Sequence, residues 1–251
     1  MLEIRDARIQ SGSYGQRSQP VDTLVLHYTA LDLEASLRVL RHRGVSAHYV
    51  LAEDGVAYKL LENHEVAWHA GVSMWRGRRN VNARSIGIEI VNLDGNSHDY
   101  PPAQVAALVE LCHHVLAQNP GIRPRDVVGH SDVAPKRKVD PGSRFPWQSL
   151  AAQGVGLWPA EPAMPQDASE AELQALLQAC GYAHPHGYGT RGDSFVFVDD
   201  PDSPPPGVSR VVRVATRDIL RAFQRHYLPA TASGEPTPAT TGVLRARAAM
   251  Q

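Results

Sequence analysis

Three short segments of the sequence combine histidines and an aspartate in a way that could hold a metal ion. They cover residues 26–29 (Leu-His-Tyr-Thr), 129–132 (Gly-His-Ser-Asp) and 138–142 (Lys-Val-Asp-Pro-Gly). Two imidazoles and one carboxylate that leave a fourth position for water are typical of catalytic rather than structural zinc. We therefore take His27, His130 and Asp140 as candidate ligands of one zinc ion. Taken singly, a histidine is more often a solvated side chain, and an aspartate before proline is usually a turn former.

Two further residues could complete a hydrolytic site. Zinc lowers the pKa of its water toward ~7, so a nucleophile for a carbonyl carbon forms at neutral pH. Glu89, on a strand beside Gly87, whose missing side chain leaves room for it, is predicted to accept the proton and return it to the leaving amine. Lys138 precedes Asp140 by two residues, and side chains at i and i+2 of an extended stretch point the same way. We expect its ammonium to stabilise the oxyanion, the alternative being a solvated lysine in the basic run 136–138.

Hydrophobic periodicity predicts the elements that must position these groups. Residues 85–91 are the clearest strand, with three isoleucines on a core face and Glu89 on a face expected to stay open. In chain order we expect a strand at 23–28, a helix at 33–41, a hairpin over 47–61 around Asp54-Gly55, the strand at 85–91, an amphipathic helix at 103–117 and a strand at 126–130.

A change of composition after Trp158 indicates a domain boundary. The proline-rich stretch that follows cannot propagate a helix and is typical of a semi-rigid linker. We expect a catalytic domain over 1–158, a linker over 159–168 and a small helical domain over 169–251. Its first helix should begin after the capping box at Ser169 and be closed by Gly181, and further helices are expected near 215–227 and 239–249.

Two motifs in the second domain are interpreted as loops. Residues 187–192 fit G-x-G-x-x-G, but a dinucleotide fingerprint follows a strand and opens a helix, whereas this one precedes a strand. We interpret it as a glycine-rich loop. His184 and His186 could form a second metal pair, but a surface loop is the preferred interpretation because no third ligand lies nearby in the sequence.

Composition excludes several classes of function. The 251 residues include 25 Lys and Arg against 26 Asp and Glu, so the chain lacks the basic field that nucleic-acid binding needs. Two cysteines are too few for a disulfide framework or a zinc–thiolate site. No apolar run approaches the ~20 residues of a membrane span, and the amino terminus lacks the pattern of a secretory signal. Neither G-x-S-x-G nor H-E-x-x-H occurs, which disfavours serine hydrolases and zincins.

Six motifs, in order, resemble those of the type 2 N-acetylmuramoyl-L-alanine amidases, with peptidoglycan recognition proteins as more distant relatives. The motifs are His27-Tyr-Thr, Ser46-Ala-His-Tyr, Trp68-His-Ala-Gly, Asn82 followed by Ser85-Ile-Gly-Ile-Glu, Gly129-His-Ser-Asp and Lys138-Val-Asp-Pro-Gly. The resemblance spans residues 20–158 and implies an α/β fold whose mixed central sheet is flanked by helices. It further implies one zinc ion and cleavage of the amide between the lactyl group of N-acetylmuramic acid and L-alanine of the stem peptide.

The same resemblance assigns roles to individual residues. It implies His27, His130 and Asp140 as zinc ligands and Glu89 and Lys138 as catalytic residues. It also implies that His69 and Asn82 line the substrate cleft. Arg43 and Arg79 are either partners of stem-peptide carboxylates or solvated side chains.

Residues 173–182 and 220–227 are similar to helical peptidoglycan-binding modules attached to such amidases. The second domain is therefore expected either to bind glycan or only to pack on the amidase domain. Two other functions stay open: a non-catalytic peptidoglycan receptor, which normally has lost a zinc ligand, and a zinc peptidase of different specificity. A peptidoglycan substrate implies action in the periplasm by an unidentified export route, with the cytoplasm as the alternative.

Overall fold

A computed structural model describes residues 2–9, 12–42, 44–159, 164, 166–182, 186–192 and 194–250. The chain divides into two units, and the predicted boundary after Trp158 coincides with one of several crossings between them. The first unit comprises Met1–Ala70, Val81–His130 and Asp140–Trp158, and the second comprises Gly71–Asn80, Ser131–Val139 and Pro159–Gln251. Of the predicted linker, residues 160–163 and 165 lie outside the described residues.

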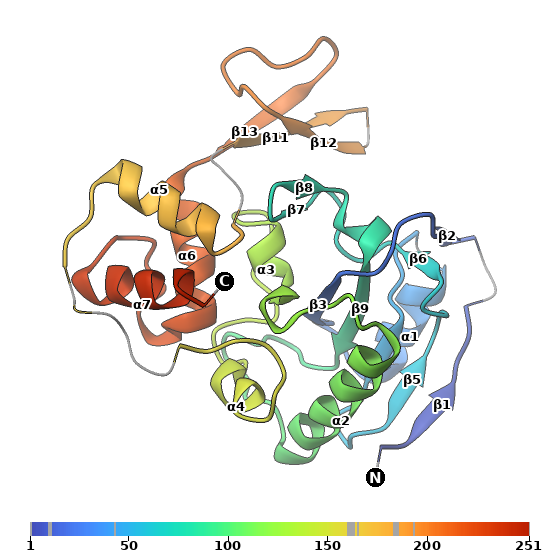
Figure 1. Ribbon diagram of the computed structural model, residues 1–251. Helices are drawn as coiled ribbons and strands as arrows, with labels where there is room; N and C mark the ends of the chain where they lie inside the picture. Colours follow the sequence, from blue (N-terminus) through green and yellow to red (C-terminus); the bar gives the residue numbers. More distant parts are fainter. Residues whose placement is uncertain are drawn as a thin grey trace. The chain divides into compact units, whose positions relative to one another are not determined.

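A mixed six-stranded sheet with the order β1-β5-β4-β9-β3-β10 forms the centre of the first unit (Figure 1). Only the β4–β5 pair, the predicted hairpin, is antiparallel, and the other neighbours are parallel. This confirms the expected mixed sheet. The strands of this unit, including the separate β2–β6 pair, are β1 (Ile4–Asp6), β2 (Tyr14–Gln16), β3 (Thr23–Tyr28), β4 (Tyr49–Leu51), β5 (Ala57–Lys59), β6 (Glu65–Ala67), β9 (Ser85–Ile90) and β10 (Val127–Gly129).

Helices cover both faces of this sheet, as its sequence pattern requires. Leu24, Leu26 and the three isoleucines of β9 pack in one cluster with apolar residues of α2, whereas Val50 packs with Leu40 of α1 in another. Val50 alternates with neighbours that belong to the α2 cluster, so α1 and α2 lie on opposite faces. The helices of this unit are α1 (Leu33–His42), α2 (Pro102–Gln118), α4 (Trp147–Ala151) and the 3-10 turns η1 (Val81–Arg84) and η2 (Pro124–Asp126).

The expectation of an open face on the strand at 85–91 is wrong. Ser85 and Gly87 are buried, and Glu89 is half-buried. The reason is that β9 is an inner parallel strand, and such strands are covered on both faces. Side chains from outside the sheet, His48 and His69, contact β9 at this face.

The second unit combines helices with a small sheet. Ser169 accepts a hydrogen bond from the Glu172 amide at the start of α5, and Gly181 follows the helix with a φ of 103°, so both predicted ends are confirmed. The elements are β7 (Met74–Trp75), β8 (Arg78–Arg79), α3 (His130–Val133, whose first residue belongs to the first unit), α5 (Glu170–Ala179), β11 (His186–Arg191), β12 (Ser194–Val198), β13 (Ser209–Val214), α6 (Thr216–Tyr227), η3 (Pro229–Thr231) and α7 (Pro238–Ala248).

The predicted glycine-rich loop is instead the central strand of an antiparallel sheet with the order β12-β11-β13 (Figure 1). A Cβ on Gly187 would lie 2.9 Å from Pro201, and one on Gly189 would lie 2.4 Å from Val208. The glycines therefore allow the loop between β12 and β13 to pack against β11. Close approach of another segment is a known reason for glycine inside a strand. His186 is buried in this strand rather than exposed, and His184 lies outside the described residues.

Buried polar contacts link the three parts of the second unit. The Asp132 carboxylate is fully buried, 2.8 Å from His226 Nδ1, and accepts a hydrogen bond of 2.9 Å from the Tyr182 hydroxyl. The Trp75 ring packs edge-on against Tyr182 at a centroid distance of 5.2 Å. Segments 71–80 and 131–139 are thus held by residues that follow position 159.

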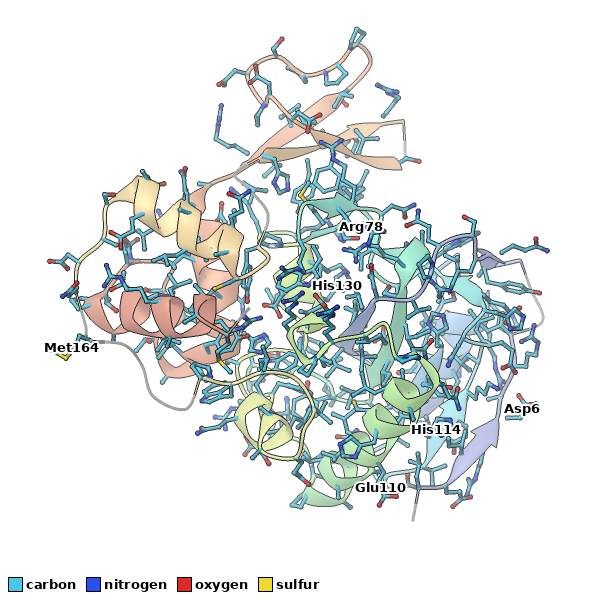
Figure 2. The ribbon with its side chains drawn as sticks, viewed as in Figure 1. Asp6, Arg78, Glu110, His114, His130 and Met164 are labelled. Carbon is cyan, nitrogen blue, oxygen red and sulfur yellow. The ribbon has the colours of Figure 1, made fainter. Side chains whose placement is uncertain are left out.

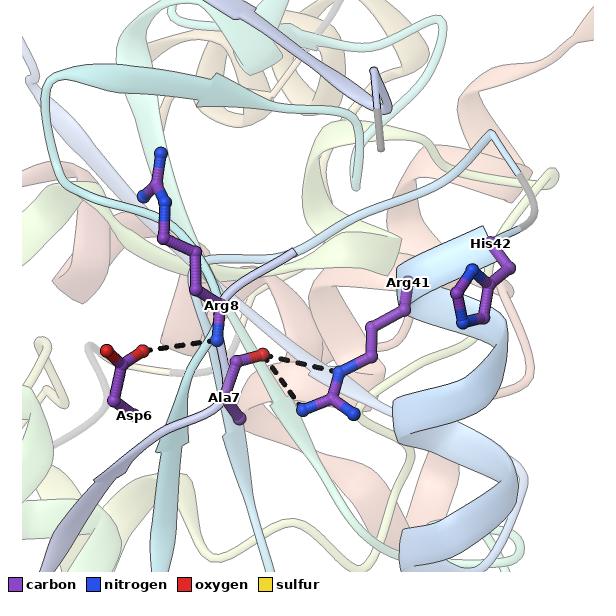
Figure 3. A pocket seen from close by; sticks show the side chains of 5 residues that line it. All are labelled: Asp6, Ala7, Arg8, Arg41 and His42. Atoms are coloured by element: carbon purple, nitrogen blue, oxygen red, sulfur yellow. Dashed lines mark hydrogen bonds between the residues drawn. The ribbon is translucent and has the colours of Figure 1, made fainter. Parts of the chain in front are cut away.

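A surface pocket of about 460 Å³ in the first unit is lined by Asp6, Ala7, Arg8, Arg41 and His42 (Figure 3). The Arg41 guanidinium donates to the Ala7 carbonyl at 3.0 and 3.3 Å, and the Arg8 amide donates to Asp6. The Arg8 guanidinium pairs with both Glu65 oxygens. These contacts tie the segment after β1 to α1 and β6. Among the described helices, none combines the length and the apolar character that crossing a membrane requires.

Candidate metal centre

Three neighbouring parallel strands bring candidate residues to one edge of the sheet. β3 lies between β9 and β10, and the register pairs His27 directly with Glu89. Gly129 at the end of β10 pairs with Leu26, so His130, labelled in Figure 2, follows beside His27. The carboxyl ends of parallel strands meet at the same edge, where α/β proteins commonly bind ligands.

The three predicted ligands converge there. The Nδ1 atoms of His27 and His130 are 2.9 Å apart, and each lies 3.0 Å from Oδ2 of Asp140. All three residues are buried, with exposed fractions of 1%, 2% and 7% respectively. Among the described residues, they form the group of histidine, cysteine and carboxylate side chains that could hold a metal ion.

The loop around Asp140 is fixed by a close crossing of two chain segments. The Tyr100 hydroxyl donates to the Pro141 carbonyl at 2.7 Å. Gly95 and Gly142 approach so closely that a Cβ on Gly142 would lie 2.3 Å from the Gly95 carbonyl. Only residues without side chains fit this crossing, which places the carboxylate at the end of a tightly held turn.

Hydrogen bonds to the outer nitrogens of the two rings determine where their protons lie. His130 Nε2 is 3.1 Å from the Ala70 carbonyl, which can only accept, so this nitrogen carries the proton. Ser85 donates its hydroxyl to the Val81 carbonyl at 2.7 Å and must therefore accept from His69 Nε2 at 3.0 Å. His69 Nδ1 is then an acceptor, and it receives the Nε2 proton of His27 at 2.9 Å. We assign both tautomers from this network.

This assignment fits a metal ion. Both Nδ1 atoms present lone pairs, so together with the carboxylate three acceptors face one another at 2.9–3.0 Å without a proton between them. Such an arrangement is repulsive unless a cation lies among the three atoms. A metal ion with bonds of about 2.0–2.2 Å to nitrogen and oxygen would be within reach of all three atoms.

Electrostatics agree with this donor set. Burial alone would raise the pKa of Asp140, and charge on the His130 and His27 rings would lower it well below the usual value; in the neutral tautomers assigned above, a cation among the three atoms would supply that charge. Burial, reinforced by the neighbouring imidazoles, lowers the pKa of His69 well below its usual value. His69 is therefore neutral, as its place between a donor and an acceptor requires.

Glu89 lies beside the triangle and outside it. Its Oε1 atom is 4.0 Å from His27 Nδ1, and its side chain is 14% exposed. A carboxylate at this distance can receive a proton from a water molecule bound at the centre, either directly or through a second water. This position agrees with the predicted proton-transfer role, which stays a prediction.

Lys138 belongs to segment 131–139 of the second unit. Its amide donates to the Ala134 carbonyl at 3.0 Å, which closes a turn. The stretch from Lys138 to Asp140 follows this turn, and the expected placement of the two side chains on the same side stays a prediction. The role of its ammonium rests on the family resemblance and stays a prediction.

His69 and Asn82, expected in the substrate cleft, make contacts within the first unit. His69 bonds to His27 and Ser85, and Asn82 Oδ1 accepts from the amides of His69 and Ala70 at 3.2 and 2.7 Å. Their contact with substrate stays a prediction. Arg79 forms an ion pair with Asp199, and Arg43 lies outside the described residues.

Sequence reasoning missed the residues that support the ligands. Ser85 had no assigned role, and the space beside Gly87 was expected to serve Glu89. A Cβ on Gly87 would lie 2.6 Å from the His69 ring, so this ring fills that space. His48 accepts from the Gly87 amide at 3.0 Å, and burial lowers its pKa to about 3. A glycine inside a strand was the available signal, because it often marks a close approach of another group.

Comparison with known proteins agrees with the motifs. A family model described as N-acetylmuramoyl-L-alanine amidase matches residues 17–143. N-acetylmuramoyl-L-alanine amidase AmiD of Escherichia coli is 35% identical over 272 residues, covering 98% of this chain and 89% of that protein. 1,6-Anhydro-N-acetylmuramyl-L-alanine amidase AmpD of Haemophilus influenzae is 33% identical over 171 residues, covering 58% of this chain and 90% of that protein.

Solved structures give the same result. The complex of Escherichia coli AmiD with the substrate anhydro-N-acetylmuramic acid-L-Ala-D-gamma-Glu-L-Lys matches with a TM-score of 0.72 and 33% identity, covering 94% of this chain and 91% of that chain. The crystal structure of AmpDh3 from Pseudomonas aeruginosa matches with a TM-score of 0.75 and 33% identity, covering 94% and 93% of the two chains. The ordered motifs, the sheet and these matches establish that the chain belongs to the N-acetylmuramoyl-L-alanine amidase family.

Proposed function

We propose that this protein is a zinc-dependent amidase of bacterial peptidoglycan or its muropeptide fragments. The bond cleaved joins the lactyl group of N-acetylmuramic acid to L-alanine of the stem peptide. The observation that carries the zinc assignment is the convergence of His27, His130 and Asp140 with two lone pairs and a carboxylate directed at one point. Family membership supplies the substrate class, because relatives with this name act on that bond.

The chemistry divides between the ion and the chain. Zinc bound by these three residues would polarise the amide carbonyl and lower the pKa of water toward ~7. Glu89 takes the proton of the attacking water at its carboxylate and delivers it to the nitrogen of the leaving L-alanine. The amine then departs as the carbon–nitrogen bond breaks, and Glu89 is again ionised for the next cycle.

Lys138 is proposed to stabilise the negative charge that develops on the carbonyl oxygen. A fixed ammonium in a partly dehydrated site stabilises such an oxyanion more than solvent does. The buried hydrogen-bonded rings of His27 and His130 keep the ligand atoms in place while this charge forms.

Two structures of relatives contain anhydromuramyl peptides, namely AmiD of Escherichia coli and AmpDh3 of Pseudomonas aeruginosa. This supports soluble anhydro-muropeptides as a substrate of the present chain. A second unit that is similar to peptidoglycan-binding modules favours the polymer as well. Since peptidoglycan lies outside the inner membrane, we propose the periplasm as the site of action.

A digest of two substrates tests this function. Purified protein, protein treated with chelator, and chelated protein given zinc back are incubated with an anhydro-muropeptide or with purified sacculi, and products are identified by mass spectrometry. We expect release of intact stem peptide, its loss with chelator and its return with zinc. Free stem peptide should stay uncleaved, because it lacks the bond to the lactyl group. Cleavage of free stem peptide would instead indicate a zinc peptidase of different specificity.

Variants separate catalysis from binding. Glu89→Gln should lower kcat by about 10²–10⁴ while zinc content stays at the wild-type level, because this side chain is not a ligand. Glu53→Gln makes the same change on an exposed turn of the same unit and should retain full activity. A protein that binds muropeptide without cleaving it, or that cleaves it after complete metal removal, would overturn the proposal.

A further inference from the structure

We infer that the dipeptide His69–Ala70, held by Asn82, positions both histidine ligands of the metal centre. The inference rests on the proposed zinc function and assigns His69 and Asn82 a role other than substrate binding. One residue of the dipeptide supports His27 through its side chain, and the next supports His130 through its backbone carbonyl.

The His27 arm is a chain of three directional hydrogen bonds. The Val81 carbonyl receives the Ser85 hydroxyl, Ser85 Oγ receives His69 Nε2, and His69 Nδ1 receives His27 Nε2. Each hydrogen bond in this series has one permitted direction, because the series ends on the Val81 carbonyl, which cannot donate. The outcome at its other end is an Nδ1 lone pair on His27 that points to the metal position.

The His130 arm is shorter. His130 Nε2 donates to the Ala70 carbonyl at 3.1 Å, which again leaves Nδ1 as the ligand atom. A backbone acceptor has no torsional freedom of its own, so the ring orientation depends on where the peptide unit of Ala70 lies. Outer partners of this kind set the tautomer and orientation of metal-binding histidines.

Asn82 couples the two arms. Its Oδ1 atom accepts from the amides of both His69 and Ala70, at 3.2 and 2.7 Å. The oxygen therefore fixes two consecutive peptide units, one of which carries the His69 ring and the other the Ala70 carbonyl. Because both hydrogen bonds are accepted by a side-chain oxygen, aspartate can replace asparagine at this position, whereas an aliphatic side chain cannot.

Close packing keeps the dipeptide from moving. His69 is buried, and its ring occupies the space left by the missing side chain of Gly87. The ring therefore has little room to rotate away from His27. These contacts together make His69, Asn82 and Ser85 positioning residues for the metal ligands.

The test compares zinc affinity with substrate affinity in matched variants of the full chain. Zinc dissociation constants come from competition with a chromophoric chelator. His69→Leu and Asn82→Leu should each weaken zinc binding about ten- to hundredfold. Asn82→Asp keeps the accepting oxygen and should bind zinc like wild type, and His69→Asn keeps an acceptor near the place of Nδ1 and should recover part of the loss.

Nitrogen NMR of the zinc-loaded wild type gives an independent readout. The tautomer assignment predicts that His27, His69 and His130 all carry their proton on Nε2. If His69→Leu does not fold, Ser85→Ala still removes the acceptor of the His69 Nε2 proton and should weaken zinc binding. A proton on Nδ1 of His69 would contradict the inference.

Outcomes distinguish this inference from the proposed function. If wild type fails to bind zinc, the proposed function is wrong and the inference falls with it. If wild type binds zinc and the leucine variants bind it equally well but show a raised KM for muropeptide, only the inference is overturned. Such a result would return His69 and Asn82 to the substrate cleft.

Discussion

Replacing Gly87 with alanine should damage the metal centre without unfolding the protein. The added Cβ would lie 2.6 Å from Cγ of His69 and 2.7 Å from two other ring atoms, whereas ordinary contacts begin near 3.4 Å. The ring must therefore withdraw by about 0.8 Å, and a shift of this size directed away from His27 would stretch the 2.9 Å contact to roughly 3.7 Å, out of hydrogen-bond range.

The expected cost follows from two separate effects. Overpacking a core position costs about 1–3 kcal/mol, which is less than the total stability of most domains. Loss of an outer partner weakens metal binding about ten- to hundredfold, which corresponds to about 1.4–2.7 kcal/mol. Gly87→Ala should thus remain folded and lose zinc affinity and turnover together.

The assay measures zinc affinity by chelator competition, stem-peptide release by mass spectrometry and unfolding by urea. Gly15→Ala is the matched control, because it makes the same change on a strand of the same unit where the nearest atom would be 3.9 Å away. It should leave zinc affinity unchanged. Wild-type zinc affinity in Gly87→Ala, or an equal loss in both variants, would refute the reasoning.

Three further predictions concern stability, each measured by urea denaturation. Tyr100→Phe should cost about 1–3 kcal/mol, because it leaves a carbonyl beside the Asp140 turn without its donor. Asp132→Ala should cost about 3–5 kcal/mol because it removes a buried carboxylate that bonds to both Tyr182 and His226, and a loss below 1 kcal/mol would contradict this. Glu65 bonds to Arg8, which holds its pKa below the usual value against the effect of burial. The contribution of the Glu65 carboxylate to stability is present above its unfolded pKa of ~4.3 and is lost as pH falls through the folded pKa. Glu65→Gln should therefore lower the free energy of unfolding by about 1 kcal/mol at pH 7, and the stabilities of the variant and the wild type should converge in acid.

The regular elements of the first unit could be predicted because their side chains repeat with the period of the structure. The isoleucines of β9 alternate, the apolar residues of α2 recur at helical spacing, and Asp54-Gly55 separates the two strands of the hairpin. Strand β11 of the second unit could not be predicted, because glycines at alternate positions lack the apolar side chains that indicate a strand.

The metal ligands could be proposed from residue types and motif order, but their supports could not. The pairing of His27 with Glu89 depends on β9 lying next to β3, and the sequence does not reveal which strands are neighbours. The roles of Ser85 and of the Ala70 carbonyl depend on hydrogen-bond direction. A backbone carbonyl has no residue type, so no sequence motif can indicate it.

The path of the chain between the two units limits how this enzyme can be recombined with its relatives. A terminal domain joined by a single linker can be exchanged by one cut, but here segments 71–80 and 131–139 belong with the residues after 159. A chimera that replaces only residues 159–251 would separate Trp75 from Tyr182 and Asp132 from His226. Successful grafts must carry all three stretches together, because each of them supplies side chains to the same buried contacts.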